Sequence, residues 1–248
     1  MPFFPFKLYN IPMEDYDPIA GYYSYIARRT DYASWYGYLK ELSGLGQLKG
    51  KSILDLGCGT GQLLSFFYAE GAFCQGVDTS SEMLSRADMK LYSTRSRGGS
   101  YELVKNDMAL FSPRGKRVFD FAYSACDSVN YLTRQELVSL ISAMKTYMAP
   151  GTVFAFDIIN PLGDFDTREV IRRSEGDIVL ERHVESGRFV TLVSCGDTAH
   201  SFVQNLFYEE DILTIASEAA AGEPEVFDFM SRERKDPACD KLQVILRV

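Results

Sequence analysis

The 248-residue chain has only two histidines, no closely spaced cysteine pair and no long apolar run. Its five cysteines form neither a C-x-x-C pair nor a cysteine–histidine spacing typical of zinc, which predicts reduced thiols and no metal site. No window approaches the roughly 20 apolar residues that a membrane helix needs, and the first residues lack a basic segment followed by an apolar one. We therefore expect a cytoplasmic protein without a metal and without membrane contact.

Basic residues are outnumbered by acidic ones. The 26 lysines and arginines face 34 aspartates and glutamates, which gives a net charge of −8. Nucleic-acid affinity depends mainly on lysine and arginine neutralising phosphates, so this balance argues against a nucleic-acid partner. We interpret two short basic clusters, Arg95 with Arg97 and the segment RRSEGD at 172–177, as solvated loops. A small-molecule substrate fits this charge better.

Segments with strand character alternate with helical segments between residues 51 and 159. Strands are expected at 51–57, 73–78, 101–107, 118–124 and 151–159, and helices at 60–71, 79–93 and 133–148. Thr79 with Glu82 and Thr133 with Glu136 have the spacing of a capping box at two of the helix starts. Such alternation is typical of a parallel sheet with right-handed crossovers, so the fold class is α/β.

The pattern changes after Gly163. Segments 177–184, 188–194 and 200–208 alternate apolar and polar residues and are joined by short turns, which predicts an antiparallel meander inserted after the fifth strand. A helix is then expected at 208–220, followed by strands at 224–229 and 241–248. Because a polar loop without a helix joins the last two strands, we expect them to form an antiparallel hairpin at one edge of the main sheet.

The segment ILDLGCGTGQ, residues 53–62, runs from a strand into three glycines. Glycines so closely spaced predict a tight turn under a bound ligand, because they would otherwise only cost chain entropy. Gln62 stands where a dinucleotide-binding fold usually has its last glycine. By itself such a turn is compatible with NAD, FAD or another adenosine cofactor.

Carboxylates follow the neighbouring strands, and ligands bind beyond the carboxyl ends of strands in an open α/β sheet. Asp55 stands two residues before Gly57, where it would repel a pyrophosphate but attract an ammonium group. Asp78 ends the second strand, where a carboxylate accepts hydrogen bonds from ribose hydroxyls. Asp107 follows the third strand, placed for an adenine, and the segment SACDSVNY at 124–131 would face the reacting end of the ligand.

These motifs, in this order and spacing, resemble those of class I S-adenosylmethionine-dependent methyltransferases. The matching segments are ILDLGCGTGQ, GVDTSSEMLSRA, NDMALF, FDFAYSACDSVNYL and GTVFAFDI. The segments YDPIAGYYSYIARRTDYASW and CDSVNYL further resemble bacterial small methyltransferases with an antiparallel insertion after the fifth strand, a group that includes sugar-amine N-methyltransferases. Where relatives often have Tyr-Asp in the N-terminal segment, this chain has Tyr23-Ser24.

The resemblance implies a Rossmann-like, mostly parallel seven-stranded sheet with a C-terminal antiparallel hairpin and a small antiparallel β insertion. Residues 1–50 would be an N-terminal helical lid, residues 51–162 and 207–248 the S-adenosylmethionine-binding domain, and residues 163–206 the insertion. Cofactor-binding roles are implied for Asp55, Gly57, Cys58, Gly59, Gly61, Asp78, Met83, Asp107, Met108, Cys126 and Asn130. Cys58 is included only as part of the loop, since a small residue is expected there on packing grounds.

The catalytic candidates are Asp127, His200 and Tyr23. A methyl group on a sulfonium is already activated, so a base is needed only to remove one proton from an amine acceptor. Each aspartate also has a purely local interpretation: Asp55 as a cap, Asp78 and Asp107 as turn residues, and Asp127 as the polar start of a helix or loop. His200, like the other histidine, lies in the meander, where a surface position is the plain interpretation.

We expect methyl transfer to a nitrogen or oxygen of a small molecule. The alternatives are a methyltransferase acting on tRNA, rRNA or protein, a non-catalytic cofactor-binding regulator, and a nicotinamide-dependent oxidoreductase. The glycine loop counts against the oxidoreductase, because Gln62 replaces the last glycine of G-x-G-x-x-G. The alternating face of the meander also allows a homodimer.

Overall fold

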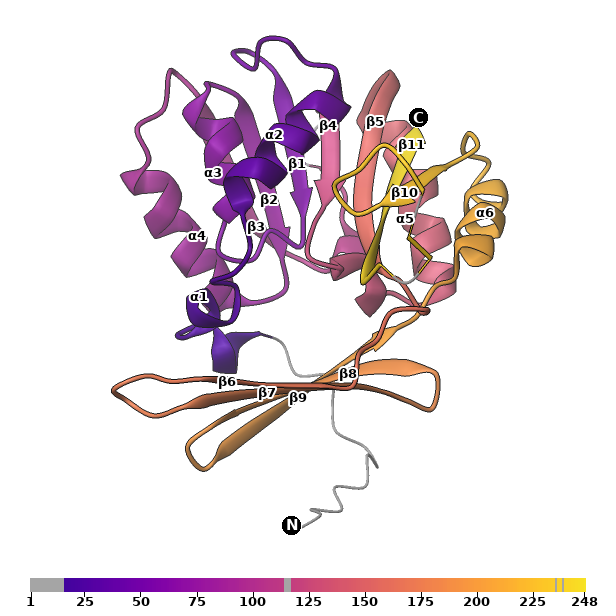
Figure 1. Cartoon of the computed structure of the whole chain (residues 1–248). Coiled ribbons are helices and arrows are strands. Elements are labelled where there is room, and N and C mark those ends of the chain that lie inside the picture. Colours follow the sequence, from indigo (N-terminus) through magenta and orange to yellow (C-terminus); the bar gives the residue numbers. More distant parts are fainter. Residues whose placement is uncertain (1–15, 114–116, 235, 238) are drawn as a thin grey trace.

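The computed structural model describes residues 16–113, 117–234, 236–237 and 239–248 (Figure 1). Residues 1–15 of the predicted N-terminal lid segment lie outside the described residues. In the described part, no helix has the length and apolar character needed to cross a membrane.

A seven-stranded sheet forms the centre of the protein, in the order β10-β11-β5-β4-β1-β2-β3. Its strands are β1 (Ser52–Leu56), β2 (Phe73–Asp78), β3 (Ser100–Lys105), β4 (Phe119–Ser124), β5 (Met148–Ile159), β10 (Glu225–Asp228) and β11 (Lys241–Arg247). Strands β1 to β5 are parallel, and β11 is antiparallel to both β5 and β10. The predicted α/β class and the hairpin at the edge are therefore confirmed.

Helices cover both faces of this sheet (Figure 1). One face packs against α5 (Arg134–Tyr147) and α6 (Glu209–Glu218), and the other against α2 (Tyr32–Ser43), α3 (Gln62–Ala69) and part of α4 (Ser81–Ser93). Strand β1, buried from Ile53 to Leu56, contacts helices on both faces because its side chains alternate between the faces. Ile53 joins the α2–α3 core, whereas Leu54 and Leu56 join the α5–α6 core.

The two predicted helix starts have different outcomes. Thr133 and Glu136 form the expected capping box at the start of α5. The predicted pairing of Thr79 with Glu82 is wrong, because Ser80 is the N-cap of α4 and accepts a hydrogen bond from the Met83 amide. Asp17, from the N-terminal segment, accepts from the Glu82 amide at 3.0 Å and from the Ser80 hydroxyl. The start of α4 is thus bound to the N-terminal segment.

A separate antiparallel sheet is inserted between β5 and α6, in the order β6-β7-β8-β9. Its strands are β6 (Thr167–Ile171), β7 (Ile178–Glu185), β8 (Arg188–Cys195) and β9 (Thr198–Asn205). The meander prediction missed β6, a five-residue strand at the edge of this sheet. In Figure 1 this sheet lies below the central sheet, beside the short helices η1 (Asp17–Ile19) and α1 (Tyr23–Ile26).

The inserted sheet and the N-terminal segment share a small apolar core of their own. Ile178, Leu180, Val193 and Phe202 from the sheet pack with Ile19, and Tyr16, Tyr22 and Tyr23 lie against this cluster. The N-terminal segment is therefore held between the inserted sheet on one side and α4 on the other.

Candidate active site

The glycine loop between β1 and α3 is fixed to the end of β2. The amides of Gly57 and Cys58 both donate to the Val77 carbonyl, at 2.8 and 3.0 Å, and the Gly59 amide donates to Asp78 Oδ2 at 2.8 Å. Gly57 has φ +78°, and a Cβ there would lie 2.7 Å from Ser128 Cβ and Oγ. The first glycine is therefore required by the close approach of the short helix η3 (Ser128–Tyr131).

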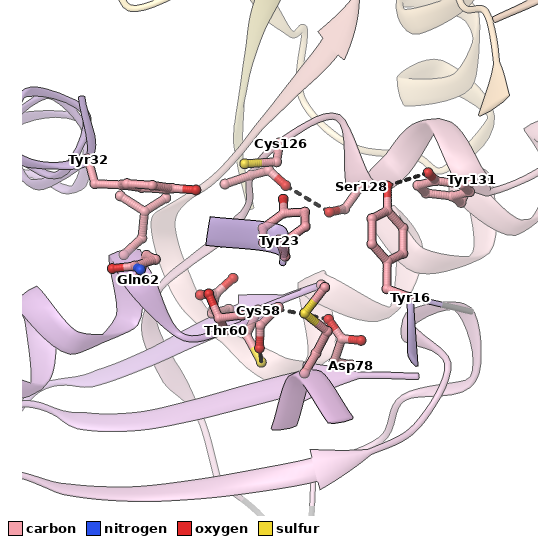
Figure 2. Close-up of a pocket in the computed structure, with 16 residues that line it drawn as sticks. Tyr16, Tyr23, Tyr32, Cys58, Thr60, Gln62, Asp78, Cys126, Ser128 and Tyr131 are labelled. Atoms are coloured by element: carbon pink, nitrogen blue, oxygen red, sulfur yellow. Dashed lines mark hydrogen bonds between the residues drawn. The ribbon is translucent and has the colours of Figure 1, made fainter. Parts of the chain in front are cut away.

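A cleft lies over this loop, at the carboxyl ends of β1, β2 and β4. Its first part, about 70 Å³, lies between the loop and the tyrosines of the N-terminal segment (Figure 2). Its second part, about 300 Å³, extends toward the end of β3. The two parts share five lining residues, which are Tyr16, Gly57, Asp78, Ser128 and Tyr131. One elongated ligand can therefore occupy both.

Asp55 lines the first part of the cleft although only 2% of its surface is exposed. Its Oδ2 accepts a hydrogen bond of 2.8 Å from the Tyr123 hydroxyl. Burial raises the pKa of Asp55 to about 8; the Tyr123 hydrogen bond opposes this rise and the Asp78 charge adds to it. A protonated Asp55 is thus ready to ionise when a cation approaches.

Asp78 lies where the two parts meet. Its Oδ1 accepts from the Ser80 amide at 2.9 Å and its Oδ2 from the Gly59 amide at 2.8 Å. Burial raises the pKa of this carboxyl, and the backbone hydrogen bonds oppose the rise. These two amides fix the orientation of the carboxylate, and each oxygen keeps a second lone pair for a ligand.

Other residues predicted for cofactor binding are divided between the parts. Cys58, Gly59, Met83 and Cys126 line the first part, and Asp107 and Met108 line the second. The predictions for two residues do not match these positions. Gly61 lines neither part: it precedes α3 with φ +71°, and a Cβ there would lie 3.1 Å from Ala87 Cβ, so its role is close packing of α3 on α4.

Asn130 also lies outside the cleft, because its side chain is fully buried and used elsewhere. Its Nδ2 donates to the Asn205 carbonyl at 2.7 Å, and its Oδ1 accepts from the Ile159 amide at 3.1 Å. The residue therefore connects η3 with β5 and β9 and does not line the cleft.

Tyrosines from the N-terminal segment close the cleft over the glycine loop (Figure 2). The hydroxyls of Tyr16 and Tyr131 are 2.6 Å apart, which links this segment to η3. Tyr23 lies opposite the loop, and burial raises its pKa well above the usual value for a phenol. Tyr23 is therefore a hydrogen-bond donor and not a base at neutral pH.

A third cavity, of about 400 Å³, lies between this cleft and the inserted sheet. It shares four residues with the first part of the cleft: Tyr16, Tyr23, Tyr32 and Cys126. On its other side it is lined by one row across the inserted sheet, Thr167, Arg182, Thr191 and Phe202, which pair with one another in register. A second molecule in this cavity would meet a ligand of the cleft at the shared residues.

The two remaining catalytic candidates, Asp127 and His200, lie in different surroundings. Asp127 lines the third cavity, but its Oδ1 is bound to Lys241 Nζ and its Oδ2 accepts 2.6 Å from Gln204 Nε2. Both oxygens are thus engaged, which makes Asp127 unsuited to accept a proton. His200, in β9, pairs with Val193 and lines none of the three cavities.

Residues 53–151 match the family described as "Methyltransferase domain". This segment is a methyltransferase domain. It spans β1 to the first residues of β5 and contains the glycine loop, Asp78 and Asp107. The predicted resemblance to methyltransferases is therefore confirmed for this segment.

The methyltransferase domain is similar to known proteins in sequence and in fold. A dTDP-3-amino-3,4,6-trideoxy-alpha-D-glucopyranose N,N-dimethyltransferase of Streptomyces venezuelae is 32% identical over 130 residues, which are 52% of this chain and 51% of that protein. The chain spans little more than half the length of this relative and of two curated relatives named as putative methyltransferases.

Two solved structures show the same fold over nearly the whole chain. An S-adenosylmethionine-dependent methyltransferase from Clostridium acetobutylicum superposes with a TM-score of 0.75 at 23% identity, covering 94% of this chain and 98% of that one. The sugar N-methyltransferase KedS8 from Streptoalloteichus gives a TM-score of 0.66 at 22% identity, covering 100% and 99%. The Rossmann-like fold of the methyltransferase domain and the added sheet are thus shared.

Sequence reasoning missed several residues of the two sites. Ser128 and Tyr131 lie in the predicted segment after β4 but were not singled out, although the chain geometry places them against Gly57 and Tyr16. Lys241 carried no signal at all, since it is the first residue of the ordinary strand β11, which lies between β10 and β5. The importance of Lys241 is visible only from its contacts with Asp127 and Asp157, which are far away in the sequence.

Proposed function

We propose that the protein is an S-adenosylmethionine-dependent methyltransferase that acts on a nitrogen or oxygen of a small molecule. One observation carries the proposal: a cleft lined by Asp55, Asp78 and Asp107 meets a separate cavity of about 400 Å³ at a few shared side chains. Donor and acceptor molecules can therefore be held apart except at the point of transfer.

The residues of the cleft fit S-adenosylmethionine. Asp78, fixed by two amides, suits ribose hydroxyls, and Asp107 and Met108 line the part of the cleft suited to an adenine. Asp55 suits the ammonium of the methionyl group, because one of its oxygens has no hydrogen-bond partner among the described residues. When bound, this cofactor supplies a methyl group that is already activated by its sulfonium.

The third cavity suits an acceptor that carries an amine. Three aspartates, Asp127, Asp164 and Asp240, line it together with the two basic residues Arg182 and Lys241, and Lys241 is already paired with Asp127. Asp164 and Asp240 make no ion pair within the described ranges and are available to attract an ammonium. A curated relative and a solved neighbour are named as N-methyltransferases of amino sugars or sugars, which supports the same acceptor class.

The chain contributes positioning and exclusion of water more than acid–base chemistry. Tyr16, Tyr23 and Tyr32 lie between the cleft and the third cavity, and neither Tyr23 nor Asp127 is suited to act as a base. An amine can lose its proton to solvent before it reacts, so this arrangement is sufficient for methyl transfer.

Calorimetric titration with S-adenosylhomocysteine, with NADH as the parallel control, tests the proposal. Micromolar binding of S-adenosylhomocysteine alone is expected, followed by methylation of a member of a panel of amino sugars and other small amines. Binding of NADH alone, or of neither compound, would refute it.

Binding of S-adenosylhomocysteine should weaken as the pH falls, because of Asp55. The raised pKa of about 8 means that free Asp55 is protonated at neutral pH, whereas an ammonium ligand requires the carboxylate. The proton must therefore leave on binding, and affinity should fall up to about tenfold between pH 7 and pH 6. Calorimetry at pH 7 in buffers of different ionisation enthalpy should show the release of one proton.

Asp55→Asn is the matched control for this linkage, since it keeps an oxygen that can accept from Tyr123 but cannot ionise. Its affinity should be lower than that of the wild type at pH 7 and nearly independent of pH between 6 and 7. Equal pH dependence in both proteins would place the linked proton on another group.

A further inference from the structure

Two consecutive residues after β4 have left-handed backbone conformations that only glycine adopts freely. Cys126 has φ +59° and Asp127 has φ +52°. Such a conformation is unfavourable for each residue, so the surrounding contacts must hold the turn in place. This turn is also the wall between the two proposed sites, because Cys126 lines both the cleft and the third cavity.

The contacts that hold the turn converge on Lys241. Its Nζ is bound to Asp127 Oδ1 and lies 2.9 Å from Asp157 Oδ2. The same Asp157 oxygen accepts 2.9 Å from the Asp127 amide, so backbone and side chain of Asp127 are both tied to one ion-pair cluster. Asp157 is 1% exposed, and its other oxygen has no partner among the described residues.

Lys241 is the cation that this cluster requires. Burial by itself lowers its pKa, but Asp127 and Asp157 raise the pKa well above the usual value, so the side chain remains an ammonium. The rings of Phe229 and Trp35 lie 5.6 and 6.0 Å from Nζ, which adds cation–π attraction. Without the ammonium, the buried carboxylate of Asp157 and the partly exposed carboxylate of Asp127 would face each other uncompensated.

The inserted sheet is bound to the same turn. Gln204, in β9 and 3% exposed, donates from Nε2 to the Asp127 carbonyl at 3.0 Å and to Asp127 Oδ2 at 2.6 Å. Lys241, at the start of β11 in the central sheet, and Gln204, in the inserted sheet, therefore hold Asp127 from two sides.

We propose that Lys241 is a positioning residue for methyl transfer. It fixes the Cys126–Asp127 turn so that a molecule in the acceptor cavity is aligned with a cofactor in the cleft. This inference rests on the proposed function. Lys241 is not a catalytic residue, because it acts through Asp127 and Asp157. Its loss should disturb the meeting point of the two molecules and leave Asp55, Asp78 and Asp107 in place.

Three variants test this role: Lys241→Met removes the ammonium, Lys241→Gln keeps one donor without the charge, and Lys241→Arg keeps the charge. Lys51→Met is the matched control. Lys51 directly precedes β1 of the same sheet and also pairs with an aspartate, Asp120 in β4, at 3.0 Å. Hydrogen exchange followed by mass spectrometry should show peptides covering 125–131 exchanging about tenfold faster or more in Lys241→Met. Lys241→Arg and Lys51→Met should exchange like the wild type, and Lys241→Gln should lie between.

Titration with S-adenosylhomocysteine and turnover complete the test. The affinity of Lys241→Met for S-adenosylhomocysteine should stay within about twofold of the wild type, since no cofactor-lining residue is changed. With an amine that the wild type methylates, kcat should fall about 100-fold, as expected for a misplaced acceptor, and Lys241→Arg should restore it.

The two proposals fail in different ways. A wild-type protein that does not bind S-adenosylhomocysteine refutes the proposed function. Unchanged exchange at 125–131 in Lys241→Met overturns the role of Lys241 alone. If Lys241→Met does not fold, the comparison of Lys241→Gln with Lys241→Arg decides, and equal exchange in these two variants also overturns the role.

Discussion

Gly57→Ala should abolish measurable binding of S-adenosylhomocysteine and destabilise the protein. At φ +78°, an alanine costs about 1 to 2 kcal/mol of backbone strain. Its Cβ would also lie 2.7 Å from Ser128 and 3.2 Å from Met108 Cε, and such overpacking costs about 1 to 3 kcal/mol. Because Ser128 and Met108 line the cleft, any relaxation moves them into the space proposed for the cofactor. Calorimetry and thermal unfolding measure the two effects.

Two further variants distinguish the effect of backbone strain from that of steric overlap between the added Cβ and Ser128. Gly50→Ala has the same backbone strain, at φ +79°, but its Cβ would meet nothing within 4 Å, so it should be destabilised only by the strain and should bind normally. Adding Ser128→Gly to Gly57→Ala removes the nearest collision and should recover part of the affinity. If Gly57→Ala binds as tightly as Gly50→Ala, close packing against η3 does not shape the cleft.

The sequence was sufficient to predict that Asp55, Asp78 and Asp107 lie together. Each stands in, or two residues after, one of the strands β1, β2 and β3, which are parallel neighbours in the sheet. Parallel neighbouring strands bring their carboxyl ends to one edge of the sheet. An aspartate at the end of each of three such strands therefore predicts that the three side chains line the same edge. The glycine loop was predictable for the same reason, since its conformation is set by residues next to one another in the chain.

Contacts between distant segments could not be predicted in this way. Lys241 and Asp127 are 114 residues apart, and Gln204 is 77 residues from Asp127. No periodic pattern records that these side chains meet, so Asp127 was interpreted as a candidate base when the structure shows its oxygens engaged. The contacts of Asn130 could not be predicted for a related reason: its partners lie in β5 of the central sheet and in β9 of the inserted sheet.

Asp78→Ala should weaken binding of S-adenosylhomocysteine about tenfold to 150-fold, which is about 1.5 to 3 kcal/mol, the range for hydrogen bonds to a charged group. Asp78 also accepts from the amides of Gly59 and Ser80, so the variant removes two hydrogen bonds that hold the loop as well. Asp17→Asn is the control for that effect, because Asp17 binds the same helix start through Ser80 and Glu82 without lining the cleft. Its affinity should stay close to that of the wild type.

A ligand without the 2′-hydroxyl group distinguishes contact with the ribose from support of the loop. If Asp78 accepts hydrogen bonds from the ribose, removal of that hydroxyl from S-adenosylhomocysteine should weaken binding to the wild type by about 1 kcal/mol or more. The same removal should cost almost nothing in Asp78→Ala, because the partner is already gone, and this coupling is what a double-mutant cycle measures. Equal losses in both proteins would mean that Asp78 only supports the loop. The ribose would then have to be bound by other residues of the cleft.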